Sequence, residues 1–213
     1  YKIEEKYIKV IPIGVDVSRF NPSKRSKEIR EKYGNNILLF SGLMVPRKRV
    51  PVLLEAMTYV IKKIPNTQLI LTGKGRFLNY YKKLSKSLGI EKNTTFLGFI
   101  DDNKLLEYYA SSDIFVFPSE KEGFGQVFLE AMASGTPVIC ADKPPMSEIV
   151  GNGGKTFKLN DSIDLSKKII ELLNNREELA RLRKNALEIV KNFDWTHITE
   201  IYNNYFKKIV NKF

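Results

Sequence analysis

The chain alternates short apolar runs with longer segments in which apolar residues recur every three or four positions. The runs predict β-strands at 8–11, 37–41, 68–72, 94–98, 114–118 and 137–141, and a further strand at 155–158 remains open. The longer segments predict helices, the clearest being 50–64, 76–88, 102–111 and 124–134. This alternation predicts an α/β fold, a Rossmann-like doubly wound parallel sheet with helices on both faces.

One hydrophobic core suits a length of 213 residues, and we expect 1–213 to form a single domain. The last segment, about 194–213, predicts a terminal amphipathic helix introduced by Trp195. Its apolar stripe consists of Ile198, Ile201, Tyr202, Tyr205, Phe206 and Ile209. Such a stripe packs either on its own domain or on a neighbouring one, and both readings stay open for parts of this helix.

The formal net charge of +11 favours a partner that is anionic, but composition does not identify it. Most lysines stand opposite the apolar helix positions, which is typical of solvated faces, and no zinc-finger spacing or basic aromatic repeat indicates nucleic acid. The single cysteine, Cys140, lies in an apolar run and is expected in the core. We expect a cytoplasmic protein, because no apolar run approaches the roughly 20 residues of a membrane span and no signal-peptide pattern appears.

In an open parallel sheet, ligands bind beyond the carboxyl ends of the strands. Three loops that follow predicted strands combine glycines with charged residues: GLMVPRKR at 42–49, GKGR at 73–76 and EKEGFGQ at 120–126. In the first, Gly42 would allow a close backbone approach, and Arg47, Lys48 and Arg49 precede a helix.

The third loop predicts an anion site. Gly123, Phe124 and Gly125 would open a helix running from Gln126 to Ala133, whose first backbone N–H groups and positive dipole end face the ligand crevice. Glu122 stands at the turn and Glu130 lies almost two helical turns further on. A carboxylate along the helix suits a ribose diol, and one at the turn can meet a group beyond the phosphates. The alternative is that Glu122 is a first-turn charge and Glu130 a solvated helix residue.

These motifs resemble a known family. IPIGVD at 11–16 with Phe20, GLMVPRK at 42–48, LTGKG at 71–75, FLGFI at 96–100, and FPSEKEGFGQVFLEAMASGTPVI at 117–139 with Glu148 are similar to the donor-binding half of the retaining two-Rossmann-domain (GT-B) glycosyltransferases of group 1, family 4. The resemblance implies a nucleotide-sugar-binding domain, the C-terminal half of that fold. It also implies a missing N-terminal acceptor domain, since 1–10 leaves no room for one, and so a fragment that binds without turnover.

The resemblance assigns roles to individual residues. Lys48 would bind the donor diphosphate, Glu130 the ribose, and Glu122 with the backbone of Gly123–Gly125 the transferred sugar. The N–H groups of Gln126 and Val127 would lie near the phosphates, and Lys48 and Glu122 would be the catalytic pair. Backbone at Phe99 and Ile100 would meet the base. Leu43 departs from the pattern, which has an arginine there; Arg47 or Arg49 would have to replace it.

The implied reaction is transfer with retention from a UDP- or GDP-linked sugar, with no cofactor and no metal. The acid pairs Asp101 with Asp102 and Asp161 with Asp164 are expected to cap helices, and His197 to have a surface or packing role. Two alternatives stay open: a sugar-nucleotide epimerase of the same architecture, and a nucleic-acid-binding α/β module. Base, sugar, acceptor and oligomeric state are not identified, and peripheral association of the full-length protein with the cytoplasmic membrane face remains open.

Overall fold

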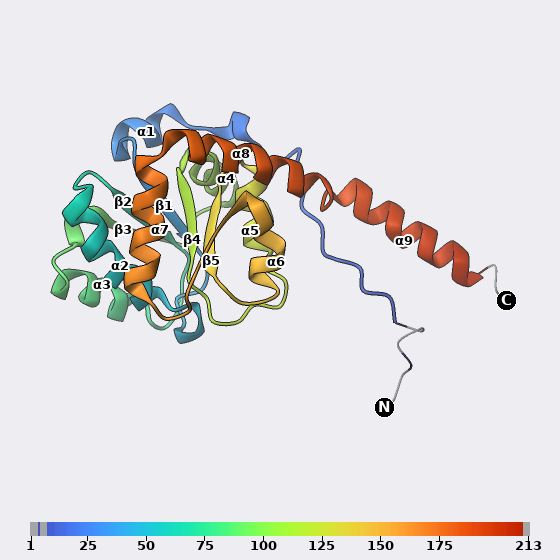
Figure 1. Ribbon diagram of the computed structural model, residues 1–213, viewed down its shortest axis with the longest axis horizontal. Coiled ribbons are helices and arrows are strands. Elements are labelled where there is room, and N and C mark those ends of the chain that lie inside the picture. Colours follow the sequence, from blue (N-terminus) through green and yellow to red (C-terminus); the bar gives the residue numbers. More distant parts are fainter. Residues whose placement is uncertain (1–3, 5–7, 211–213) are drawn as a thin grey trace.

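The computed structural model describes residues 4 and 8–210. Within these residues one sheet contains six parallel strands in the order β3-β2-β1-β4-β5-β6 (Figure 1). The strands are β1 (Ile37–Ser41), β2 (Gln68–Thr72), β3 (Thr94–Gly98), β4 (Ile114–Phe117), β5 (Val138–Ala141) and β6 (Gly154–Phe157). All residues of β1, β4 and β5 are buried, as expected for central strands covered on both faces.

Helices cover both faces of this sheet, so the predicted doubly wound α/β fold is confirmed. On one face α2 (Val50–Lys63) packs against α3 (Leu78–Ser87) and α7 (Ser162–Asn174). On the other face α4 (Asp102–Ser111) contacts α1 (Lys27–Tyr33) and α5 (Gln126–Ala133), and α5 packs against α8 (Arg176–Lys191). The short α6 (Met146–Val150) joins β5 to β6.

The strand order reverses between β1 and β4, which are neighbours in the sheet although β2 and β3 separate them in sequence. Connections from β1 lead outward one way, and connections from β4 lead outward the other way. Such a switch point opens a crevice at the carboxyl ends of the two strands. The loops 42–49 and 118–125, two of the segments singled out from the sequence, follow those strands.

The predicted strand at 8–11 is wrong. Residues 8–14 have no strand structure. The next residue, Val15, forms an isolated β-bridge with Asp194. Ile8 and Val10 are 55% and 83% exposed. An apolar run becomes a buried strand only where a sheet edge pairs with it, and here the run extends away from the six strands (Figure 1).

The terminal helix is present as α9 (Trp195–Val210), and the rest of the predicted segment, 211–213, lies outside the described residues. Of its stripe only Ile198 is buried, while Tyr202, Phe206 and Ile209 are exposed. Figure 1 shows α9 extending away from the sheet and its covering helices. Only the first turn of α9 therefore buries a residue of this stripe against the rest of the domain. No helix among the described residues has the length and apolar character needed to span a bilayer.

Candidate functional site

The loops after β1 and β2 are joined through their backbones. Gly42 N donates to Thr72 O at 3.1 Å, and Met44 N donates to Lys74 O at 3.0 Å. Gly73 has a φ of +115°, and a Cβ there would lie 2.0 Å from the Gly42 carbonyl oxygen. Glycine is required at 73 because of this close approach. Gly42 itself needs no positive φ, so its contribution is the carbonyl that Gly73 meets.

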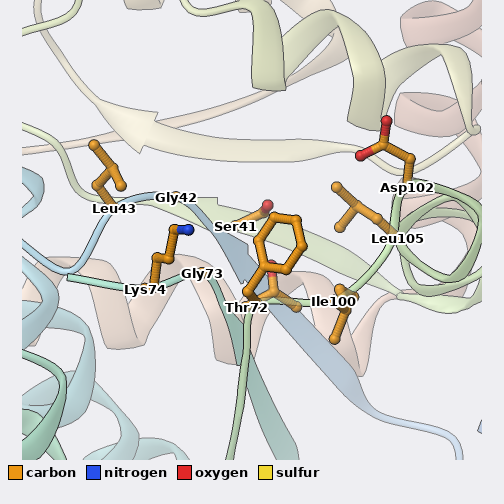
Figure 2. A pocket seen from close by; sticks show the side chains of 10 residues that line it. Ser41, Gly42, Leu43, Thr72, Gly73, Lys74, Ile100, Asp102 and Leu105 are labelled. Carbon is orange, nitrogen blue, oxygen red and sulfur yellow. The ribbon is translucent and has the colours of Figure 1, made fainter.

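A cavity of about 280 Å³ lies at this edge of the sheet (Figure 2). Its lining comes from the ends of β1, β2 and β3 and from the start of α4: Ser41, Gly42, Leu43, Thr72, Gly73, Lys74, Phe99, Ile100, Asp102 and Leu105. The Nζ atom of Lys74 lies 5.1 Å from the centre of the Phe99 ring. A largely apolar cavity with a few polar groups has the character of a small-ligand site.

Lys48 ends the short 3-10 turn η3 (Pro46–Lys48), and its side chain is 8% exposed. Its Nζ atom donates to Glu122 Oε1 at 2.7 Å and lies 4.5 Å from the centre of the Phe117 ring. Burial lowers the pKa of the Lys48 ammonium, and the hydrogen bond to Glu122 opposes that change. The cation is therefore held in a partly dry position by a carboxylate and an aromatic face.

Glu122 Oε1 accepts three hydrogen bonds. The donors are Lys48 Nζ, Arg47 Nη1 at 3.1 Å, and Ser119 Oγ in a very short contact. The Glu122 side chain is 11% exposed. In the structure this carboxylate thus pairs with Arg47 and Lys48, and the two predicted catalytic residues, Glu122 and Lys48, are direct partners.

Arg47 and Arg49 point to different partners. Arg47 is 51% exposed and also donates to the Lys121 carbonyl at 3.0 Å. Arg49 has a left-handed φ of 51° and forms a 2.5 Å ion pair with Glu120. Only Arg47 joins the group around Glu122, so it is the better placed of the two to replace the arginine expected at Leu43. Leu43 is 52% exposed on the cavity wall.

Helix α5 begins at Gln126, as the sequence predicts, and no side chain caps it. Gly125 needs its φ of +88°, and a Cβ there would lie 2.4 Å from the Phe128 ring. Gly123 has open space around its Cα. The Phe124 ring packs on Phe193 at 6.0 Å, so its side chain has a structural role. Phe128 N donates to the Gly125 carbonyl at 2.8 Å, while the backbone N–H groups of Gln126 and Val127 have no partner within the helix.

Glu130 lies on α5 and is half-buried. Its Oε2 atom accepts a hydrogen bond from the hydroxyl of Tyr109 at 2.9 Å. Burial raises the pKa of Glu130, while the Tyr109 hydrogen bond and the charge of Arg19 oppose this effect. Glu130 is therefore not a fully solvated residue on the helix surface, which was the alternative that the sequence left open.

The predicted residues thus fall into three neighbouring groups, at the cavity, at Lys48 and at Glu130. Sequence reasoning missed Lys74, Ser119 and Tyr109 as site residues. Lys74 could have been singled out as the cation within the GKGR loop. For Tyr109 no local signal exists, because it is 21 positions from Glu130 and lies on another helix.

Of the two acid pairs expected to cap helices, Asp101 and Asp161 do so, whereas Asp102 and Asp164 lie in the first turns and Asp164 Oδ2 accepts from Lys158 N at 2.8 Å. Asp101 Oδ1 accepts from Lys104 N at 3.0 Å, and Asp161 Oδ1 accepts from Asp164 N at 2.9 Å. Asp102 pairs with Arg19. His197 is exposed on α9, as expected for a surface residue. Within the part of the chain that the structure describes, no three acids, histidines or cysteines are grouped to hold a metal ion.

The known proteins that this chain resembles include glycosyltransferases. A D-inositol 3-phosphate glycosyltransferase of Nocardia farcinica is 30% identical over 212 residues, which cover 94% of this chain and 47% of that protein. The Anabaena protein HepE, solved in complex with UDP, matches with a TM-score of 0.87 at 25% identity, over 96% of this chain and 58% of that one. The chain spans about half the length of these relatives.

One solved relative is itself a single domain. The C-terminal domain of a glycosyl transferase group 1 family protein from Francisella tularensis matches with a TM-score of 0.74 at 27% identity, over 84% of this chain and 97% of that one. The family model described as glycosyl transferases group 1 matches residues 22–189. The motifs around the crevice, the doubly wound sheet and these matches agree, and this chain belongs to the glycosyl transferases group 1 family.

Proposed function

We propose that this chain is the donor-binding domain of a retaining glycosyltransferase, which transfers a sugar from a UDP- or GDP-linked donor to an acceptor held by a second, N-terminal domain. The observation that carries the proposal is the convergence, at one switch point, of a buried lysine, an uncapped helix start and an adjoining cavity. A nucleoside diphosphate needs these three features: cations for the phosphates, N–H donors for their oxygens and a cavity for the base and ribose.

The cavity supports a location for the nucleoside. Phe99 and Ile100 line it, in agreement with a base held against the backbone after β3. Glu130 lies on the side where Asp102 and Ser41 bound the cavity, because both are neighbours of the Glu130–Tyr109 pair. The ribose would then lie between the base and the diphosphate, with its diol on Glu130. The relative HepE was solved with UDP, which supports a uridine or similar nucleotide here.

The reaction proceeds by departure of the diphosphate from the anomeric carbon. Negative charge then grows on the leaving phosphate oxygen. Lys48, Arg47 and the first N–H groups of α5 stabilise that charge more strongly than they stabilise the intact donor, which lowers the barrier. Glu122 is next to the same cations and, at the turn before α5, is placed to orient the transferred sugar. The acceptor enters on the same face of the sugar from which the diphosphate leaves.

A second domain completes this site in the proposal. The exposed apolar side of α9, with Tyr202, Phe206 and Ile209, extends away from the sheet and would pack on that domain. Without it the chain binds the donor but brings no acceptor within reach, so the domain alone has no transferase turnover. We place the full-length protein in the cytoplasm, with peripheral association with the membrane open to test by flotation.

A panel of ligands tests the proposal. Thermal melting of the chain is measured with UDP, GDP, ADP and their sugar conjugates at millimolar concentration. One nucleoside diphosphate should raise the melting temperature, because a ligand that binds only the folded state stabilises it. Transfer from donor to acceptor by the full-length protein, rather than isomerised donor, separates a transferase from an epimerase. No stabilisation by any member of the panel would reject the donor-site proposal.

A further inference from the structure

Tyr109 is the fully buried partner of the proposed ribose carboxylate. It lies on α4, its side chain has 0% exposure, and its hydroxyl donates to Glu130 Oε2 at 2.9 Å. Burial raises the pKa of this phenol well above its usual value, so the hydroxyl keeps its proton at any ordinary pH. It is therefore a fixed donor for Glu130.

The surroundings of Tyr109 hold its ring in place. Phe20 meets the ring edge-on at 5.9 Å and Phe115 packs at 5.4 Å. Thr136 Oγ1 donates to the Tyr109 carbonyl at 2.6 Å. Phe20 belongs to the N-terminal motif that the sequence singled out and that the donor site does not use. Phe20 and Phe115 thus pack on the ring and Thr136 holds the backbone, while the hydroxyl lies beside Ser41 and donates to Glu130.

We propose that Tyr109 is a positioning residue: it binds one oxygen of Glu130, fixes the orientation of that side chain, and leaves the other oxygen to accept from the ribose diol of a nucleoside diphosphate. The inference rests on the proposed function, because it assigns Glu130 the ribose. It goes beyond that function in naming the group that sets the orientation of Glu130.

Few other charges act on Glu130. In the part of the chain described, the titratable groups that act on Glu130 are Tyr109 and Asp102 from α4 and Arg19 from the turn before α1. Arg19 and Asp102 pair with each other at 2.9 Å and are 43% and 71% exposed, so water and salt screen them. Tyr109 is thus the one buried group that favours the ionised form. Removing its hydroxyl raises the pKa of Glu130, and the neutral form then persists to a higher pH.

The test compares Tyr109→Phe with a matched control, Tyr108→Phe. Tyr108 neighbours Tyr109 on α4 and is also buried, but its ring packs with Tyr33 at 6.4 Å, and the carboxylates that act on it are Glu28 and Glu107. Binding of UDP and of GDP is measured by calorimetry from about pH 5.5 to 8.5. We expect Tyr109→Phe to move the acid-side loss of binding to higher pH, because the hydroxyl that favours the ionised form of Glu130 is lost. Tyr108→Phe should follow the wild-type profile.

A double variant makes the assignment specific. In a Glu130→Gln background the carboxyl no longer titrates, so adding Tyr109→Phe should leave the shape of the pH profile unchanged. A further variant, Phe20→Leu, loosens the packing of the phenol but retains its hydroxyl. It should move the profile in the same direction by less, and it decides the question if Tyr109→Phe does not fold.

The outcomes separate the two proposals. Wild-type binding with superimposable pH profiles for Tyr109→Phe, Tyr108→Phe and wild type would overturn the role of Tyr109 and leave the donor site intact. An equal shift in the Glu130→Gln background would also overturn it, because Tyr109 would then act through another group. Failure of the wild-type chain to bind either nucleotide would overturn the proposed function and this inference with it.

Discussion

Glu122 and Glu130 stand eight positions apart in one motif, yet the structure gives them opposite surroundings. Glu122 accepts from Lys48, Arg47 and Ser119, so its charge is compensated inside the protein. Glu130 is half-buried beside a neutral phenol, and its partial burial raises its pKa. Glu122 therefore has cations beside it that compensate its charge, whereas the partial burial of Glu130 disfavours its charged form.

Replacing either acid should therefore change the stability of the folded protein as well as ligand binding, and the two changes in stability should have opposite signs. A carboxylate paired with buried cations stabilises the folded state, and its removal leaves those cations without an anion. A carboxylate that is buried without a cation destabilises the folded state at neutral pH. Sites for ligands are often built from such locally unfavourable groups.

The largest expected effect is on nucleotide binding by Glu130→Gln. The variant keeps the shape of the side chain but loses a charged acceptor for the ribose, which is worth about 1.5–3 kcal/mol. Affinity for the bound nucleoside diphosphate should fall about 10- to 100-fold, with or without an attached sugar. Calorimetry with both ligands checks this. A loss of affinity for the sugar nucleotide alone would indicate that Glu130 contacts the transferred sugar, and it would contradict the separate roles of the two acids.

Next in size is the loss of the buried cation in Lys48→Met, which retains the aliphatic stem against Phe117. Nucleoside diphosphate affinity should fall more than tenfold, because one desolvated charge contact is lost. Binding of the nucleoside alone should be unchanged, and that ligand serves as the control in the same titration. Equal losses for both ligands would indicate a folding defect in place of a phosphate contact.

Glu122→Gln should have the opposite sign to Glu130→Gln for the diphosphate. Its removal frees Lys48 and Arg47 from a competing anion, so nucleoside diphosphate affinity should rise about threefold, while the extra affinity for the attached sugar disappears. The resemblance assigns Glu122 to the transferred sugar, which by itself implies no effect on nucleoside diphosphate binding, and the contact of Glu122 with Lys48 revises that implication. Weaker binding of both ligands would contradict the revision.

A smaller effect distinguishes the two arginines. Arg47→Gln should weaken nucleoside diphosphate binding about threefold, because Arg47 lies beside Glu122 and is half exposed. Arg49→Gln should stay within about twofold of wild type, since Arg49 pairs with Glu120 instead. The two variants differ by two positions and are matched in chemistry. A greater loss for Arg49 would assign it the place of the missing arginine.

The smallest effect is a pH-dependent difference in stability. The raised pKa of Glu130 means that the folded state holds its proton more tightly than the unfolded state does. Its penalty is therefore absent below the usual carboxyl pKa near 4.5 and grows as pH rises through the folded value. Glu130→Gln should melt higher than wild type at neutral pH, with the difference vanishing near pH 4. A constant difference across this range would contradict the pKa direction.

Much of the fold follows from the sequence because its strands are buried on both faces. The runs at 37–41, 68–72 and 94–98 match strands residue for residue, and 102–111 matches α4. The strand at 155–158 is present, shifted by one residue, as β6. The apolar run at 8–11 failed because apolar character does not reveal whether a partner strand exists. Helices α1, α6 and α8 were not predicted as elements.

The site was predictable in location but not in its pairings. The strand-end rule led to the loops 42–49 and 120–126, and the start of α5 at Gln126 was correct. The contact between Lys48 and Glu122 joins residues 74 positions apart, and it depends on how two loops meet across the sheet. The separation of Arg47 from Arg49 depends on the left-handed φ at Arg49, which its sequence neighbours do not indicate.

The most direct test of the account is one melting experiment on wild type, Glu122→Gln and Glu130→Gln at pH 7.5, with and without the nucleoside diphosphate that binds. We expect Glu130→Gln to melt at a higher temperature than wild type, and we expect the ligand to raise its melting temperature by less. We expect Glu122→Gln to lose about 1–3 kcal/mol of unfolding free energy and so to melt at a lower temperature than wild type. The ligand should raise its melting temperature by more than it raises that of wild type. If both variants change in the same direction in both quantities, the two acids do not have the separate roles described for them.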